Sequence, residues 1–110
     1  MNLSAQNRLI LFTRYPIAGQ TKTRLIPYLG AEQAADLQRK MTEFIVDTTR
    51  PLQIRDRLSL EVHFAGGSLR QMQRWLGPKL AYRPQQGCNL GDRLHHAFSQ
   101  GFQADAERIV

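Results

Sequence analysis

The chain lacks most of the features that mark a secreted or a membrane protein. Cys88 is its one cysteine, so no disulfide can form within the chain. The longest early apolar run, residues 9–12, is far too short for a signal-peptide core or a membrane span. There is no low-complexity segment and no internal repeat. These absences exclude a disulfide scaffold, and we expect a cytoplasmic protein with no membrane partner.

Acidic residues are missing from two stretches of the chain. None precedes Glu32 and none lies between Glu61 and Asp92, whereas each stretch carries four basic residues: Arg8, Arg14, Lys22 and Arg24 in the first, and Arg70, Arg74, Lys79 and Arg83 in the second. The net charge of the whole chain is +6. This distribution favours a surface that meets an anion, which could be a nucleotide phosphate, a nucleic acid or an acidic lipid headgroup. A basic surface that serves solubility alone is the alternative.

The apolar patterns predict strands that alternate with helices. Strands are expected at residues 8–13, 59–65, 80–83 and 107–110, with helices at 31–50, between Ser68 and Gly77, and from Asn89 to Phe102. This order predicts one α/β domain over residues 1–110, a three-layer α/β/α arrangement around a mostly parallel, doubly wound sheet.

Local signals support each predicted helix. In the first helix the residues expected to face the core are Ala34, Leu37, Met41, Phe44, Ile45 and Thr48, and Pro51 is expected to end it. Ser68 and Gln71 form a capping box before the second helix, whose buried side is Met72, Trp75 and Leu76. Asn89 is the expected N-cap of the third helix, whose apolar stripe is Leu90, Leu94, Ala97, Phe98 and Phe102.

Ligands of such sheets bind at the carboxyl ends of the strands. The loops expected there are residues 14–30, 66–68 and 84–89, and these lie inside the acid-free stretches.

The first of these loops has the residue types that hold phosphate. Gly19 allows a tight turn close to a ligand, Lys22 supplies a compact charge, and Arg24 can bind a phosphate through two hydrogen bonds. Thr21 and Thr23 add hydroxyl donors. A basic surface loop without a ligand is the alternative interpretation.

Two nucleotide-binding motifs are excluded for this loop. A Walker A motif needs glycine where the chain has Pro16 and Thr21, and a dinucleotide fingerprint needs a Gly-x-Gly that is absent.

Two motifs carry a family resemblance: Arg14-x-Pro16-x-x-Gly19-x-x-Lys22-Thr23-Arg24-Leu25, and Gln86-Gly87-x-Asn89-Leu90-Gly91-Asp92-Arg93-Leu94. In this order they resemble the signatures of a bacterial family of glycosyltransferase-A-like, or nucleotide-diphospho-sugar transferase-like, proteins. That family is related by fold to nucleotidyltransferases, including the phospholactate guanylyltransferases. The resemblance covers nearly the whole chain.

The resemblance implies a nucleoside phosphate or nucleotide sugar as ligand, and Mg²⁺ or Mn²⁺ as cofactor. Lys22 and Arg24 would contact phosphates, while Asn89 and Asp92 would border the base or ribose. The nucleotide-binding residues predicted in this way are Arg14, Gly19, Lys22, Thr23, Arg24, Gly87, Asn89 and Asp92. For Asp92, a role that only complements the helix dipole is the alternative.

In that family the next strand leads to a Gly-Thr-Asp-type segment whose aspartate is the expected metal ligand. This sequence ends at residues 108–110, where that strand would begin. We therefore expect an N-terminal portion truncated after the fourth strand, with no metal ligand, no assigned catalytic residue and no activity on its own.

Three functions follow from these observations. The first is a glycosyl- or nucleotidyltransferase in the full-length protein, and the second is a nucleotide-binding module without catalysis. The third, a nucleic-acid binder, is disfavoured because no known motif is present and aromatic residues do not alternate with basic ones. The last strand would leave an open sheet edge, which allows a homodimer. Structural roles are expected for Cys88 and for His63, His95 and His96.

Overall fold

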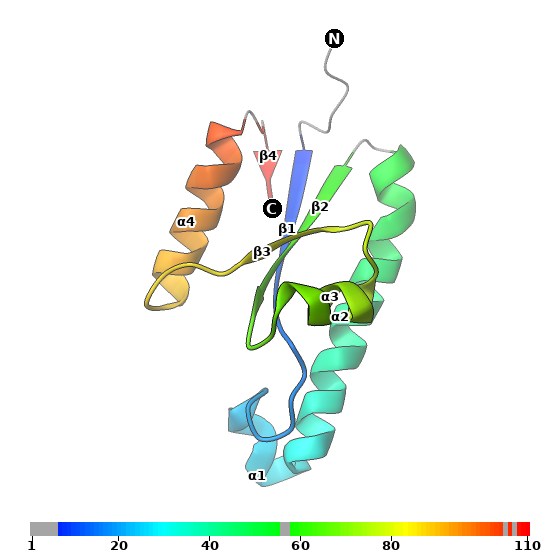
Figure 1. Ribbon diagram of the computed structural model, residues 1–110, viewed down its shortest axis with the longest axis vertical. Helices are drawn as coiled ribbons and strands as arrows, with labels where there is room; N and C mark the ends of the chain where they lie inside the picture. The colour runs from blue at the N-terminus through cyan, green and yellow to red at the C-terminus, as the bar shows by residue number, and fades with distance from the viewer. Residues whose placement is uncertain (1–6, 56–57, 105, 107) are drawn as a thin grey trace.

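The computed structural model describes residues 7–55, 58–104, 106 and 108–110, and these form a parallel α/β fold (Figure 1). The elements follow one another in the order β1 (Asn7–Arg14), η1 (Thr23–Leu25), α1 (Ile26–Leu29), α2 (Ala31–Arg55), β2 (Leu58–Ala65), α3 (Leu69–Leu76), β3 (Ala81–Pro84), α4 (Leu90–Gln103) and β4 (Arg108–Ile109). Glu107, where the last strand was predicted to begin, lies outside the described residues.

The four strands form one sheet in the order β3-β2-β1-β4, and every pair is parallel. β1 and β2 pair along their full length, from Asn7 opposite Leu58 to Arg14 opposite Ala65. Because all strands run the same way, their carboxyl ends point to one edge of the sheet, toward the lower part of Figure 1. The predicted parallel sheet is confirmed.

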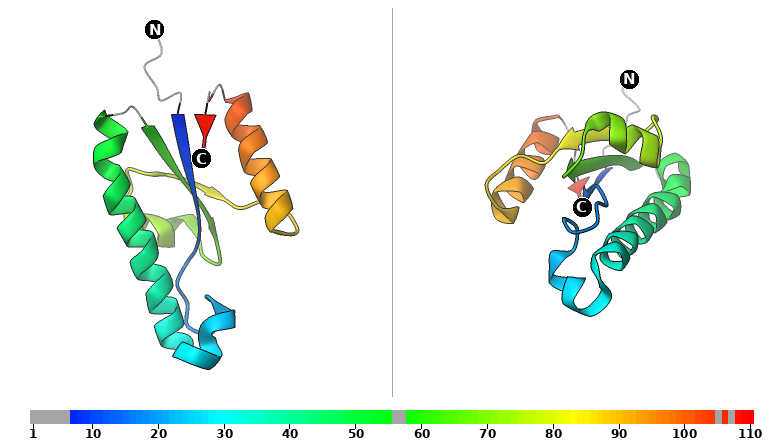
Figure 2. Two further views of the ribbon diagram at one scale, coloured as in Figure 1. Left: turned by 180° about the vertical axis from the view of Figure 1, so that it is seen from behind. Right: turned by 60° about the horizontal axis from the view of Figure 1, so that its bottom comes forward.

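Helices cover both faces of this sheet. In the right-hand view of Figure 2, α2 and α3 lie on one side of the strands and α4 lies on the other. The chain steps in one direction from β1 through β2 to β3 and then returns past β1 to β4, so right-handed crossovers place α4 on the opposite face. The predicted three-layer arrangement is therefore confirmed.

The main core lies between the sheet and α2 with α3. Its buried members come from α2, β2 and α3: Val46, Leu60, Val62, Phe64, Met72 and Leu76. Leu9 and Leu11 of β1 pack against them. The alternation predicted for the second strand is confirmed on this face, since its three apolar residues all belong to the core.

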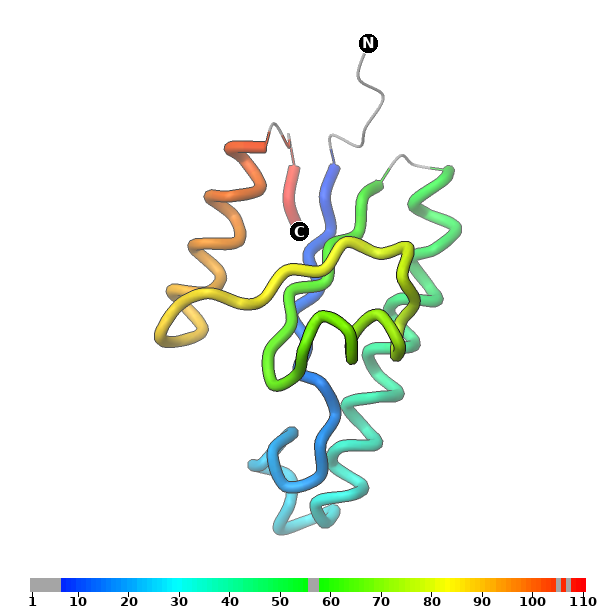
Figure 3. The backbone as a smooth tube through the Cα atoms, viewed as in Figure 1, coloured from blue at the N-terminus to red at the C-terminus, as the bar shows by residue number. Residues whose placement is uncertain are grey.

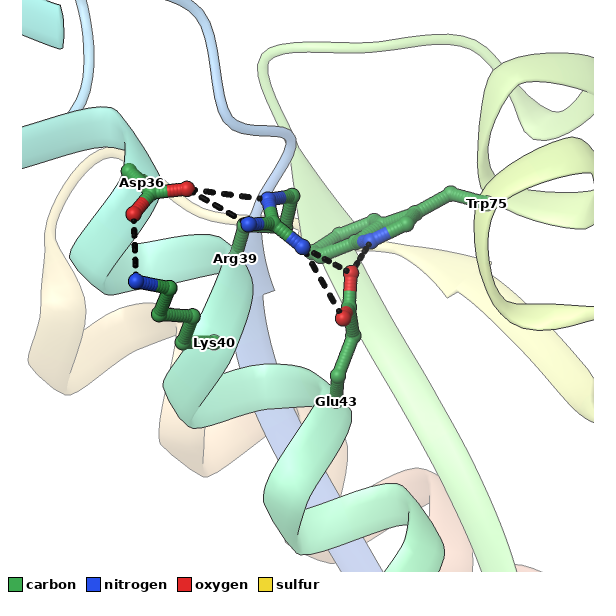
Figure 4. Close-up of polar contacts among 5 residues, drawn as sticks. All are labelled: Asp36, Arg39, Lys40, Glu43 and Trp75. Carbon is green, nitrogen blue, oxygen red and sulfur yellow. Dashed lines mark hydrogen bonds and ion pairs between the residues drawn. The ribbon is translucent and has the colours of Figure 1, made fainter.

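A polar network joins α2 to α3 at the margin of this core (Figure 4). The indole Nε1 of Trp75 donates to Glu43 Oε2 at 2.7 Å, and Arg39 pairs with both Glu43 and Asp36. Hydrogen bonds from Lys40 and Arg39, together with their charges, lower the pKa of the Asp36 carboxyl. Exposed ion pairs of this kind stabilise a fold only slightly. The main effect of the network is therefore to orient α3 against α2, and its contribution to the stability of the fold is small.

The prediction that Pro51 ends the first helix is wrong, because α2 continues to Arg55. Proline removes one intrahelical donor, but its fixed φ is compatible with a helix. Leu52 and Gln53 in the following turn are half-buried, so packing holds the last turn in place.

The rotation of α2 also differs from the prediction. Met41 and Phe44, expected in the core, are 47% and 70% exposed, while Thr42 is buried. Thr42 Oγ1 lies 2.7 Å from Thr13 Oγ1, and Gln38 Nε2 donates to the same Thr13 hydroxyl at 2.7 Å. A buried strand-end hydroxyl needs partners, so hydrogen bonding sets which side of α2 faces β1.

The α4 helix begins as predicted, because Asn89 Oδ1 accepts from the backbone N–H of Asp92. Of its predicted apolar stripe, Ala97 is buried as expected, whereas Leu90, Leu94, Phe98 and Phe102 are exposed, with exposed fractions of 64% for Leu90 and 49% for Phe102. Gly101 is buried instead, and a Cβ there would lie 2.5 Å from Ile109 Cδ1. A side chain at position 101 would not fit this close approach, so α4 meets β4 at Gly101. None of the helices in the described part of the chain has the length and apolar character needed to cross a membrane.

Candidate functional site

The loop after β1 is folded around a buried threonine. Thr21 is 1% exposed; its Oγ1 accepts from the backbone N–H of Ile17 at 2.9 Å and donates to the carbonyl of Tyr15 at 3.1 Å. Gly19 adopts φ +87° in the turn between them, which only glycine adopts readily. The Thr21 hydroxyl is thus used within the loop and is not offered to a ligand, contrary to its predicted role as a ligand donor.

Lys22 follows directly and has a left-handed backbone, with φ 49° and ψ 48°. Its carbonyl accepts from the N–H of Leu25 and so starts the 3₁₀ turn η1. Left-handed geometry is costly for a lysine, and here the anchored loop on one side and the 3₁₀ turn on the other impose it.

An open hollow of about 590 Å³ lies beside this turn, and its lining includes four residues of the predicted site: Arg14, Lys22, Thr23 and Arg24. Gln20 and Leu25 complete the lining. The three basic side chains make no ion pair with any residue that the structure describes. Uncompensated positive charge in a concave surface attracts an anion. The volume of the hollow is in the range of small-molecule binding sites.

The loop after β2 lies against the start of this hollow. Gly66 has φ +77°, and a Cβ there would lie 3.0 Å from the side chain of Arg14. A Cβ on Gly67 would lie 2.7 Å from Tyr15 Cβ. The two glycines predicted as a strand terminator therefore have a second role, since they let the residues after β1 approach the end of β2.

The loop after β3 is tied to the same strand ends by Gln85, a residue that sequence reasoning missed. Its Nε2 donates to the carbonyls of Thr13 at 3.2 Å and His63 at 3.0 Å, and its backbone N–H donates to Phe64 at 2.8 Å. Arg93 donates in turn to Gln85 Oε1 and to the carbonyl of Gly87, both at 3.1 Å. No local pattern marks Gln85, because its partners are distant in sequence.

Structural contacts within the loop and the start of α4 explain why glycine and asparagine stand at two predicted positions of the second motif. Gly87 has φ +136°, and a Cβ would lie 2.8 Å from the backbone nitrogen of Arg93. Asn89 caps α4, and Asp92 is exposed in its first turn. These residues do not line the basic hollow, although Figure 3 shows their loop at the same carboxyl-end edge. The structure thus brings Arg14 and residues 22–25 of the first motif together in one hollow, whose lining does not include Gly19, and places the second motif along the same edge.

A divalent metal does not fit the residues present at this edge. Mg²⁺ needs several oxygen ligands, usually including carboxylates. Asp92 is the one acidic residue of the two motifs. Within residues 7–55, 58–104, 106 and 108–110, no three His, Cys, Asp or Glu side chains come together in a way that could hold a metal ion.

A second charged cluster lies on the face of the sheet that α4 covers. Glu61 pairs with Arg8 at 2.9 Å, with His63 at 3.1 Å and with Arg83 at 3.5 Å, and the His63 ring stacks on Phe12. Burial lowers the pKa of His63, although Glu61 acts in the opposite direction. His63 is thus held by its ion-pair partner Glu61 and by the ring of Phe12, in keeping with the structural role expected for it.

The fold and the loops define the class: a parallel α/β protein whose candidate ligand loops follow the strands of a doubly wound sheet. Residues 48–110, more than half of the chain, match the family described as uncharacterized proteins conserved in bacteria (DUF2064). The chain therefore belongs to this family. No curated protein matches it.

A solved structure resembles the chain closely: a putative nucleotide-diphospho-sugar transferase from Desulfovibrio desulfuricans G20. The TM-score is 0.79 and the sequence identity is 30%. The similarity covers 96% of this chain and 45% of that protein, so the chain spans less than half the length of its structural relative.

Proposed function

We propose that this chain supplies the phosphate-binding part of a transferase acting on a nucleoside-diphosphate sugar or a nucleoside triphosphate. The observation that carries the proposal is the hollow beside η1, where Arg14, Lys22, Thr23 and Arg24 meet. Support comes from the structural likeness to a putative nucleotide-diphospho-sugar transferase and from the position of the hollow at the carboxyl ends of the strands.

The side chains of the hollow are suited to hold and orient a diphosphate. Lys22 is a compact cation, while Arg14 and Arg24 present planar donors that match phosphate oxygens in pairs. Thr23 adds a hydroxyl at the start of η1. Neutralising phosphate charge and fixing its orientation are the main contributions of a protein to such transfers. A divalent metal, where a protein of this kind binds one, adds further charge neutralisation, and the residues described here do not hold it.

Thermal unfolding with candidate ligands tests the proposal. UDP-glucose, GDP-mannose, GTP and CTP are added separately to the chain, each with and without Mg²⁺. A ligand at about 100 times its dissociation constant stabilises the folded state by about 2.7 kcal/mol. We expect at least one nucleotide to give such a shift. A folded sample that no nucleotide stabilises would overturn the proposal.

Paired variants then place the site. Lys22→Ala with Arg24→Ala should abolish the shift, because both cations line the hollow. Arg74→Ala with Lys79→Ala removes the same charge from exposed positions outside it and should keep the shift. Equal losses in the two pairs would indicate a general charge effect and contradict a site at this hollow.

A further inference from the structure

The second loop is held to the first by a small set of hydrogen bonds. Gln85 is half-buried and bridges two neighbouring strands, since its Nε2 donates to the carbonyls of both Thr13 and His63. Thr13 directly precedes Arg14, whose side chain lines the basic hollow. The contact therefore joins the second loop to the residue from which the phosphate hollow begins.

Arg93 closes this arrangement from the helix side. Its guanidinium donates to Gln85 Oε1 and to the carbonyl of Gly87, so it links the first turn of α4 to the start and the middle of the loop. Both of these partners are neutral oxygens, so Arg93 holds the loop through hydrogen bonds to uncharged groups. Gly87 permits the close approach, because a side chain there would collide with the backbone of Arg93.

The surface that this set of contacts holds is uncharged and exposed. Residues 86–89 are all exposed, and Figure 3 shows their loop at the carboxyl-end edge of the sheet. Amide and backbone groups, such as those of Gln86 and Asn89, can hydrogen-bond to a base or ribose without a charge.

We propose that Gln85 and Arg93, the Gln85–Arg93 clamp, are positioning residues that hold the second loop where it recognises the nucleoside attached to a diphosphate. The inference rests on the proposed function, because it assumes that phosphates occupy the hollow. The clamp acts through the loop and does not itself touch the phosphates. Its loss therefore reduces affinity for nucleoside diphosphates and spares affinity for pyrophosphate.

The test compares the affinities of pyrophosphate, UDP and GDP in the same buffer by calorimetry. In the parent chain we expect UDP or GDP to bind more tightly than pyrophosphate. In Gln85→Ala and in Arg93→Ala, the ratio of UDP or GDP affinity to pyrophosphate affinity should fall about tenfold, which corresponds to the net contribution of about one hydrogen bond. The affinity for pyrophosphate itself should change less than about threefold. The double variant should lose no more than either single one, because the two residues act as a unit.

Two further variants separate positioning from general stability. Gln85→Glu keeps the acceptor for Arg93 but removes the donor to the strand carbonyls, so it should lose the preference while staying folded. Gln73→Ala, an exposed glutamine on α3, is the matched control and should keep it.

The outcomes are distinguishable. A clamp variant that has a lower melting temperature but still prefers UDP or GDP to pyrophosphate as the parent does would overturn the proposed role of the clamp. A clamp variant whose affinity for pyrophosphate falls as much as its affinity for UDP or GDP would overturn that role as well. A parent chain that binds pyrophosphate without any preference for UDP or GDP also overturns it, while the phosphate hollow stands. A parent that binds none of the three overturns the proposed function as well.

Discussion

The two faces of the sheet are built from different chemistry. Toward α2 and α3 the strands present Leu60, Val62 and Phe64 to an apolar core. Toward α4, the same strand β2 presents Glu61 and His63, both less than 10% exposed. One face is held by burial of apolar area, and the other by mutual pairing of charges.

The difference teaches which face can tolerate change. Apolar packing loses energy in proportion to the area and volume removed from it. A buried ion pair gains little over an apolar replacement of the pair but loses much when one partner is removed. The apolar face should therefore respond to each truncation by itself, and the charged face should respond mainly to broken pairs.

The largest expected effect is at the centre of the apolar face. Met72 is 0% exposed, and Met72→Ala should lower the free energy of unfolding by about 3 kcal/mol through lost burial and a cavity. Urea unfolding measures this change. Met72→Leu conserves volume and should cost less than about 1.5 kcal/mol. Equal costs for the two variants would contradict a tightly packed core at this position.

The charged face should show a non-additive response. Glu61→Leu alone leaves the half-buried Arg8 without its carboxylate partner and should cost about 2 to 3 kcal/mol. Adding Arg8→Met should recover most of that loss, to within about 1 kcal/mol of the parent chain. A double-mutant cycle by urea unfolding gives the coupling energy. Strict additivity would mean that Arg8 and Glu61 do not depend on each other.

His63 should make the stability depend on pH. Its folded pKa lies below the ordinary value of 6.5, mainly because of burial. As pH falls through the ordinary value, the unfolded chain takes up a proton before the folded one does, so the folded state loses stability until the folded pKa is passed. Urea midpoints at pH about 7.5 and 5.5 should therefore differ, and less so in His63→Gln. A difference of the same size in that variant would assign the effect to another group.

The smallest effect should come from apolar residues that face outward. Leu90 is 64% exposed on α4, and Phe44 is 70% exposed on α2. Leu90→Ser and Phe44→Ser should each change the free energy of unfolding by about 0.5 kcal/mol or less. Thermal unfolding of both variants, measured together with Met72→Ala, compares the loss of stability at exposed positions with the loss in the core. A loss above about 1.5 kcal/mol at either position would show that the residue is covered in solution.

Sequence reasoning succeeded where the controlling contacts are local. The capping box of Ser68 with Gln71 and the cap at Asn89 span three residues each, and both were predicted. The order of strands and helices followed from apolar periodicity in the same way. The first motif was located by its position after a strand; Arg14, Lys22, Thr23 and Arg24 of this motif line one hollow, and their binding of a ligand stays a prediction.

What could not be predicted depends on partners far apart in the chain. The rotation of α2 is set by Thr42 meeting Thr13, 29 residues away, and an apolar count does not register a hydroxyl pair. The bridge from Gln85 to Thr13 spans 72 residues. The pairing of Glu61 with Arg8 was likewise invisible, because strand alternation marks Glu61 as a solvent-facing residue.

The left-handed backbone of Lys22 sets stability against the anion binding proposed for this side chain. Glycine would adopt the same φ without the cost of about 1 kcal/mol that a lysine bears there. A selection for heat resistance alone would therefore favour Lys22→Gly and remove a cation from the hollow. Retention of a lysine at this position in heat-selected variants would be a sign that binding of an anion, and not folding, determines the residue.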